Sequence, residues 1–158
     1  MNKKKRFFML CLCLAVLNIA FIWGNSLLPR EVSSAFSKMV GAVLDWFLPG
    51  PVTTSQGTGQ GILRKIAHFL EFCSLGFLFC VMTCLQNRKM WMRCVLPCSM
   101  GVAVAAIDET IQIFAPERGP QLRDVGIDSL GVILGVGVAI LAAWIWNQYM
   151  KKYSHVRE

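Results

Sequence analysis

Charge is scarce in this sequence, and the little that is present is unevenly placed. Only 16% of the 158 residues are Asp, Glu, Lys or Arg, whereas soluble domains carry about 25%. Hydrophobic residues make up 55% of the chain and are gathered into long runs. The composition therefore excludes a soluble domain large enough to carry the function alone, and the long apolar runs indicate an integral membrane protein.

Familiar catalytic and cofactor motifs are also missing. The sequence has no nucleophile elbow, no P-loop and no zinc-binding motif. Its seven cysteines form no CxxC pair and lie within the apolar runs, so we expect reduced thiols that act as small apolar side chains. No cofactor and no metal are predicted. Nucleic acid is not an expected partner either, because the net charge of +7 forms no extended basic face.

Four apolar runs are long enough to cross a bilayer as helices, at about 7–23, 62–85, 91–114 and 125–146. About 20 helical residues span the hydrocarbon core of a membrane. The first run follows a cluster of Lys and Arg, as in a signal peptide, but it is long and ends in bulky residues, so we expect it to be retained. The predicted fold class is an all-α membrane protein, with a four-transmembrane-helix bundle forming one domain over 1–158.

The placement of the cations predicts how the helices cross the membrane. With the N-terminus inside, the cytoplasmic ends hold one acid, Glu158, and ten cations. These cations are Lys3, Lys4, Lys5, Arg6, Arg88, Lys89, Arg93, Lys151, Lys152 and Arg157. Because cytoplasmic segments carry the excess of Lys and Arg, we expect a multi-pass protein of the cell membrane with both termini in the cytoplasm.

The one long connection, 25–61, is then extracellular. Its apolar residues recur at spacings of four and three, which predicts an amphipathic helix. They are Val32, Phe36, Met39, Val40, Val43, Leu44 and Phe47. We predict an interfacial helix lying on the outer leaflet, and a helix packed over the mouth of the bundle is the alternative. The stretch 49–61 is rich in Gly, Pro, Thr and Ser, which is typical of a flexible linker.

Charged residues inside the spans fall on narrow stripes. On the second helix, Arg64, His68 and Glu71 are spaced i, i+4 and i+7, with Lys65 at the edge of that face. Two further stripes follow the same spacing on the third and fourth helices. They are Gly101, Ala105, Asp108 and Gln112, with Glu109 beside them, and then Asp124, Asp128, Gly131 and Gly135. Small residues mark close helix contacts in membranes, so these acids are expected to point into the bundle.

All three stripes are predicted to meet at the outer end of the bundle. The second and fourth helices begin there and the third helix ends there, so one pocket is expected, capped by the short loop with Arg118 and Arg123. Ionisable residues within a membrane indicate function by default. A salt-bridge lattice that only holds the bundle together is the alternative.

The residue types of this cluster indicate two roles. Proton transfer would fall to the candidate catalytic residues His68, Glu71, Asp108 and Glu109. Binding of an anionic group would fall to Arg64, Lys65, Gln112, Arg118, Arg123, Asp124 and Asp128. Pairing with arginine explains the acids without a metal ion, although carboxylate oxygens also suit a hard cation.

These motifs, in this order, resemble the VanZ-like family of bacterial membrane proteins. Residues 64–71 resemble its R-K-x-A-H-F-x-E signature, and residues 108–118 resemble its D-E-x-x-Q-x-F and P-x-R element. Residues 124–135 resemble its final D-x-x-x-[ND]-x-x-G-x-x-x-G helix. Phe72 and Ile111 stand where many members have Tyr and His, so a mechanism that needs that Tyr or a second His does not carry over.

The resemblance implies an envelope protein that lowers susceptibility to teicoplanin-type glycopeptides, and it implies no known reaction. Its outer pocket would bind a lipid head group or an envelope partner. The expected partner is a membrane lipid or a lipid-linked envelope precursor. A homodimer is a further possibility, because the Gly131-xxx-Gly135 pair is a spacing found where transmembrane helices associate. The alternative function is a membrane-embedded acid–base enzyme acting on an anionic lipid-linked substrate. A small exporter is least favoured, because the charges lie at one end of the bundle and not at its middle.

Overall fold

Four α-helices make up nearly all of the structure, a computed structural model that describes residues 2–28, 39, 42, 46, 58–115 and 121–154. The helices are α1 (Lys3–Leu27), α3 (Thr58–Leu85), α4 (Met90–Gln112) and α5 (Leu122–Ser154). Each is long and apolar enough to cross a membrane, and the described residues include no strand. The predicted fold class is therefore confirmed, and the chain is a multi-pass membrane protein.

The first helix extends beyond the apolar run that predicted it. It begins directly after Asn2, whose side-chain oxygen accepts a hydrogen bond from the backbone N–H of Lys4 at 3.4 Å. Such an N-cap satisfies a backbone donor that the helix itself leaves unpaired. At its other end α1 continues to Leu27, so Asn25 and Ser26 lie in the helix and not in the loop where we expected them.

The last helix is also longer than expected, whereas α4 is slightly shorter. α5 continues through Lys151 and Lys152 to Ser154, and cations in a last turn are stabilised by the negative end of the helix dipole. α4 ends at Gln112, so Phe114, which was expected at its end, lies beyond the helix and is exposed. The apolar length of a run sets the minimum span, while caps and charges decide where each helix stops.

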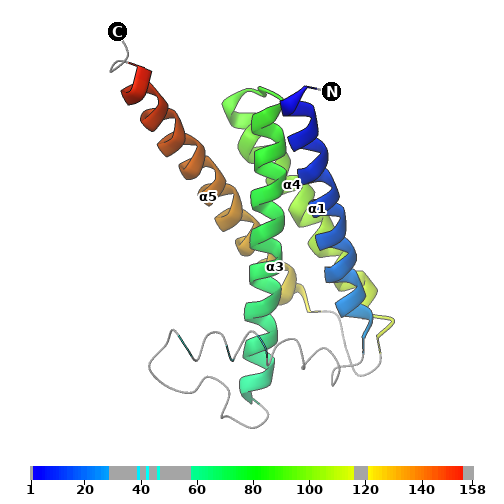
Figure 1. The fold of residues 1–158 in the computed structure, drawn as a ribbon. Coiled ribbons are helices and arrows are strands. Elements are labelled where there is room, and N and C mark those ends of the chain that lie inside the picture. Colours follow the sequence, from blue (N-terminus) through cyan, green and yellow to red (C-terminus); the bar gives the residue numbers. More distant parts are fainter. Residues whose placement is uncertain are drawn as a thin grey trace.

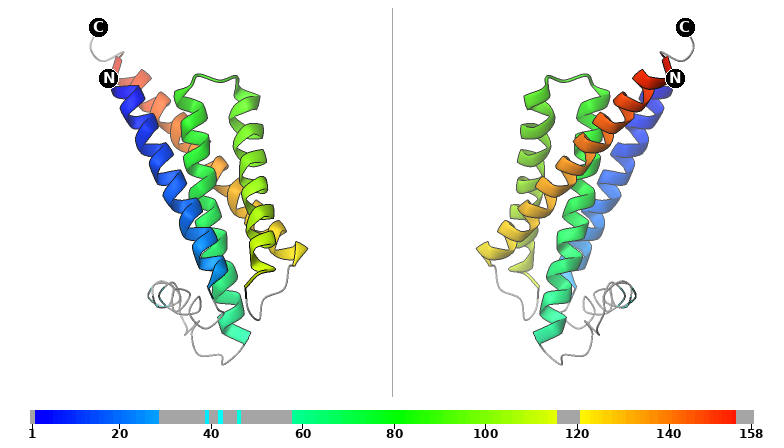
Figure 2. Two further views of the ribbon diagram at one scale, coloured as in Figure 1. Left: turned by 90° about the vertical axis from the view of Figure 1, so that its right-hand side faces the viewer. Right: turned by 90° about the vertical axis from the view of Figure 1, so that its left-hand side faces the viewer.

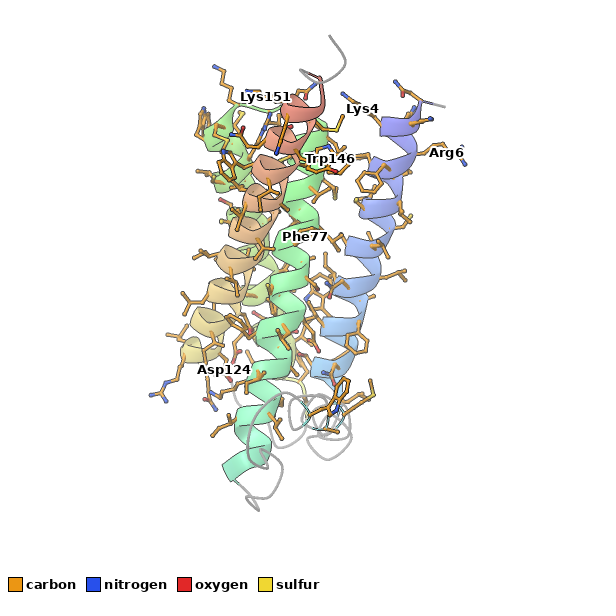
Figure 3. All side chains as sticks on the ribbon, turned by 60° about the vertical axis from the view of Figure 1, so that its left-hand side comes forward. Lys4, Arg6, Phe77, Asp124, Trp146 and Lys151 are labelled. Carbon is orange, nitrogen blue, oxygen red and sulfur yellow. The ribbon has the colours of Figure 1, made fainter. Side chains whose placement is uncertain are left out.

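The start of α1 and the end of α5 lie at the same end of the bundle (Figure 1), near Lys4, Arg6, Trp146 and Lys151, with Asp124 at the opposite end (Figure 3). We call this opposite end, where α1 and α4 end and α3 and α5 begin, the site end. α3 and α4 form a hairpin, and α5 crosses them obliquely (Figure 2). The cytoplasmic placement of the two termini stays a prediction.

Glycines allow α5 to pack closely against α3. A Cβ atom on Gly131 would lie 2.5 Å from the carbonyl oxygen of Phe69, and one on Gly135 would collide with the carbonyl group of Cys73. From the α3 side, a Cβ atom on Gly76 would collide with the backbone of Val132. Close approaches of this kind stabilise helix pairs in membranes through van der Waals contact. The Gly131-xxx-Gly135 pair thus serves packing inside the chain.

The interfacial helix predicted within 25–61 falls almost entirely outside the described residues. Met39, Ala42 and Trp46 are described there, and they have helical backbone conformation and exposed side chains. The position of such a helix on the outer leaflet stays a prediction.

Candidate functional site

A small pocket lies at the site end between α3, α4 and α5. Its lining residues are Arg64, Lys65, His68, Gln112, Asp124, Ile127 and Asp128. All of them except Ile127 belong to the set that the sequence predicted. The volume open to the centre of a water-sized sphere is about 10 Å³. This is room for about one water molecule or one monatomic ion.

An ion pair lies at the mouth of this pocket. The Nζ atom of Lys65 lies 2.5 Å from Oδ1 of Asp124, and the two side chains are 32% and 16% exposed. Both residues belong to the first turns of the apolar parts of their helices, so the pair joins the start of the α3 span to the start of α5.

A more deeply buried group lies behind the mouth, and three helices contribute to it. His68 of α3, Asp108 of α4 and Asp128 of α5 each place one nitrogen or oxygen atom within 4.8 Å of the other two. Their exposures are 6%, 0% and 4%. The glycine contacts explain this meeting, since Gly131 lies one turn after Asp128 and touches Phe69, the neighbour of His68. We call these three residues the deep cluster.

Glu71 lies beside the deep cluster on α3. Its Oε2 atom is 3.7 Å from Nδ1 of His68, and both side chains are 8% exposed. This distance is longer than a hydrogen bond. Within the described part of the chain, neither carboxylate oxygen of Glu71 has a hydrogen-bond partner. A buried carboxylate in this condition is costly, so its position next to His68 needs an explanation.

The first helix also contributes polar groups, and the sequence analysis missed them. Ser26 of α1 accepts a hydrogen bond at 3.4 Å from the amide nitrogen of Gln112, which also donates to Oδ2 of Asp108 at 2.9 Å. Asn18 donates to the hydroxyl of Ser74 at 2.5 Å and to the carbonyl oxygen of Glu71 at 3.3 Å. The available signal was the occurrence of two asparagines seven residues apart in an apolar helix, the half-buried Asn18 and the buried Asn25.

The remaining predicted residues lie apart from the pocket or outside the described residues. Glu109 is buried, and its carboxylate accepts a hydrogen bond from the backbone N–H of Gln121, which joins α4 to the segment before α5. Arg123 is exposed and is not among the described residues that line the pocket. Arg118 lies outside the described residues, so its predicted role stays a prediction.

Acidic groups outnumber basic groups in the described part of the site. Lys65 is engaged by Asp124, and the described side chains that line the pocket include one further cation, Arg64, whereas the carboxylates of Glu71, Asp108, Glu109 and Asp128 are all buried. A charge inside a membrane costs about 2.5 to 3.5 kcal/mol at the centre of a helix, and less towards the interface. The site is therefore suited to take up further positive charge, either as protons or as a bound cation.

Comparison with known proteins gives a match over most of the chain. A family model described as VanZ/LLP1 matches residues 7–144. The matched range includes the first three apolar runs, all but the last two residues of the fourth run, and every residue of the predicted site. No curated protein and no solved structure matches the chain.

Proposed function

Because the chain belongs to the VanZ/LLP1 family, we propose that it is an envelope membrane protein that lowers susceptibility to teicoplanin-type glycopeptides. The observation that carries the proposal is the polar pocket at the site end, whose mouth holds the Lys65–Asp124 ion pair. An anionic group that approaches this mouth meets two basic side chains, those of Arg64 and Lys65.

The proposed orientation places the site end at the outer leaflet. Lys4, Arg6 and Lys151 lie at the opposite end (Figure 3), and segments rich in Lys and Arg stay in the cytoplasm. The pocket then faces the side of the membrane on which glycopeptides act. Both termini are cytoplasmic in this arrangement.

The proposed ligand is a phosphate-bearing lipid head group and not the drug itself. The interior of the pocket has room for about one small ion, so a glycopeptide does not fit inside it. A head group would bind at the mouth, where Lys65 would exchange the carboxylate of Asp124 for a phosphate oxygen, with Arg64 as a second donor. Binding of this head group would hold a lipid of the outer leaflet at the protein, and this would change the access of the drug to the membrane surface.

A second candidate function is a membrane-embedded acid–base enzyme that acts on an anionic lipid-linked substrate. The observation that favours it is the buried pair of His68 and Glu71, 3.7 Å apart and directly behind the basic mouth. His68 would transfer a proton, and Glu71 would orient and stabilise the imidazolium. Conversion of an anionic lipid-linked substrate by the purified protein in lipid bilayers would distinguish this function from simple binding.

Expression in a glycopeptide-sensitive Gram-positive host tests the first proposal. We expect tolerance of teicoplanin to rise without a change in the peptidoglycan stem peptide, because the chain has no motif of a ligase or peptidase. Lys65→Gln, at the mouth, should return tolerance to that of the host alone. Lys152→Gln removes the same charge at the opposite end and should leave tolerance raised.

Membrane levels of each variant are measured on the same cells. Unchanged tolerance with the wild-type protein present in the membrane contradicts the proposal. Equal tolerance of the Lys65 and Lys152 variants contradicts the role of the mouth.

A further inference from the structure

The deep cluster brings together three metal-ligating side chains. His68, Asp108 and Asp128 are all buried, each comes from a different helix, and their donor atoms lie within 4.8 Å of one another. We propose that the deep cluster binds one divalent transition-metal ion. This goes beyond the proposed function and does not rest on it, since the ion would join α3, α4 and α5 whether or not the mouth binds a head group.

The separation of the donor atoms is close to what an ion requires. Ligand atoms at about 2.0 to 2.2 Å from a tetrahedral ion lie about 3.4 Å from one another. For an ion to bind, these donor atoms, which lie within 4.8 Å of one another, would approach to about 3.4 Å through side-chain rotation. The backbone contact at Gly131 holds α5 against α3 close to Asp128 and His68, so the helix packing already places these two side chains near each other.

Glu71 supplies an independent indication. Its side chain is 8% exposed, is directed at His68, and has no hydrogen-bond partner for either oxygen among the described residues. In metal sites, a ligating histidine donates its second ring N–H to a carboxylate, which fixes the ring. Glu71 lies on the Nδ1 side of His68 at 3.7 Å, so with an ion bound Nδ1–H would face the Glu71 carboxylate and Nε2 would be the ligand.

The amide of Gln112 plays the same part for a second ligand. Its nitrogen donates to Oδ2 of Asp108 at 2.9 Å and is itself near the hydroxyl of Ser26. This hydrogen bond fixes the rotation of the Asp108 carboxylate, as outer groups do around bound metals. Both the histidine and one aspartate of the deep cluster thus have an orienting partner.

Charge and volume agree with a small cation. The pocket lined by His68 and Asp128, beside which Asp108 lies fully buried, has about 10 Å³ open to a water-sized sphere, which is room for about one ion. The described site also has more carboxylates than basic groups, and a divalent ion supplies the missing positive charge. One imidazole with two carboxylates favours Zn²⁺ or Mn²⁺ over Ca²⁺ and Mg²⁺, which prefer ligand sets made of oxygen alone.

Binding of Mn²⁺ to the full-length purified protein tests the proposal. Mn²⁺ is the probe because the seven cysteines would compete for Zn²⁺ but are poor ligands for Mn²⁺. The protein carries an affinity tag without histidine and is first treated with chelator. We expect saturable binding of one Mn²⁺ per chain in electron paramagnetic resonance titration, displaced by Zn²⁺, and a raised melting temperature.

Variants locate the ion. Asp108→Asn and Asp128→Asn should lose saturable binding, and Glu71→Gln should weaken it by about 10- to 100-fold through the orientation of His68. Glu109→Gln is the matched control, since it removes the same charge from the next residue of α4 and its amide oxygen can still accept from Gln121. It should keep one Mn²⁺ per chain.

Melting temperatures without metal show whether each variant is folded. If Asp108→Asn unfolds, His68→Gln on α3 replaces it as the test of the ligand set. Absence of saturable Mn²⁺ binding to the wild-type protein overturns the proposal, and so does equal binding to the Asp128 and Glu109 variants. Neither result bears on teicoplanin tolerance, so the two proposals fail separately.

Discussion

The Nζ atom of Lys65 and the Oδ1 atom of Asp124 lie 2.5 Å apart at the mouth of the pocket, where α3 and α5 come together. The pair joins residues that are far apart in the chain. It also neutralises the most exposed carboxylate of the site, while the carboxylates behind it are nearly inaccessible.

This ion pair is expected to couple α3 and α5 only modestly. For partly exposed pairs the coupling free energy is about 0.2 to 1 kcal/mol. Lys65→Met, Asp124→Asn and the double variant form a cycle that isolates this term, read from thermal unfolding in detergent. A coupling free energy of zero would contradict the expected coupling of α3 and α5 through this pair.

Substitution of the glycines on α5 should separate packing positions from open ones. A Cβ atom on Gly135 collides with the carbonyl group of Cys73, so Gly135→Ala should destabilise the fold by about 1 to 3 kcal/mol. Gly137 has nothing within 4 Å of a Cβ atom, so Gly137→Ala should be neutral or stabilise by up to about 1 kcal/mol. Equal effects on unfolding would contradict the close α3–α5 contact.

Variants of His68 and Glu71 should distinguish a functional site from a structural lattice. If the cluster acts on a ligand, His68→Ala and Glu71→Gln abolish drug tolerance while the melting temperature changes little. If it is a lattice, loss of a buried charge partner costs about 3 to 5 kcal/mol, and tolerance falls only with the amount of folded protein. Since Lys65 is paired with Asp124, a change at Glu71 does not leave Lys65 without its partner.

For the lattice case, a second substitution that neutralises His68, which lies 3.7 Å from Glu71, should restore both stability and tolerance to the Glu71 variant. Tolerance and unfolding are measured for the single and double variants together. Recovery of both properties would remove the support for a ligand site.

Cysteine labelling should establish the orientation. A single cysteine at Gln86, on a cysteine-free background, lies in the α3–α4 turn at the end that holds the termini and should resist labelling by impermeant reagents in intact cells. Gln86 suits this test better than Asn87, whose φ of 54° is a conformation that asparagine adopts more readily than cysteine. Labelling from outside would reverse the proposed topology and place the pocket in the cytoplasm.

The fold was predictable because two simple signals agree. The apolar runs fix the number of spans, and the i, i+4, i+7 spacing of polar and small residues fixes which faces turn inward. Gly101, Ala105, Asp108 and Gln112 were placed on one face of α4, and all four are buried.

The contribution of α1 was harder to predict. Its ionisable residues all precede the apolar run, so Asn18 and Ser26 were hidden among stronger apolar neighbours. Ser26 was also assigned to the loop, because an apolar window ends before the helix does. Its contact with Gln112, 86 residues away, depends on tertiary packing. No local pattern encodes such a contact.

The length of α5 has a consequence for the way the protein sits in its bilayer. Its 33 residues form a rod of about 50 Å, whereas the hydrocarbon core is about 30 Å thick. The oblique course of α5 (Figure 1) shortens its projection on the membrane normal, and its glycine contact with α3 acts as a pivot near one end. A change in bilayer thickness alters the tilt of such a lever. Because Asp128 lies one turn from that pivot, a change of tilt moves it far less than the distant end of α5 at Ser154.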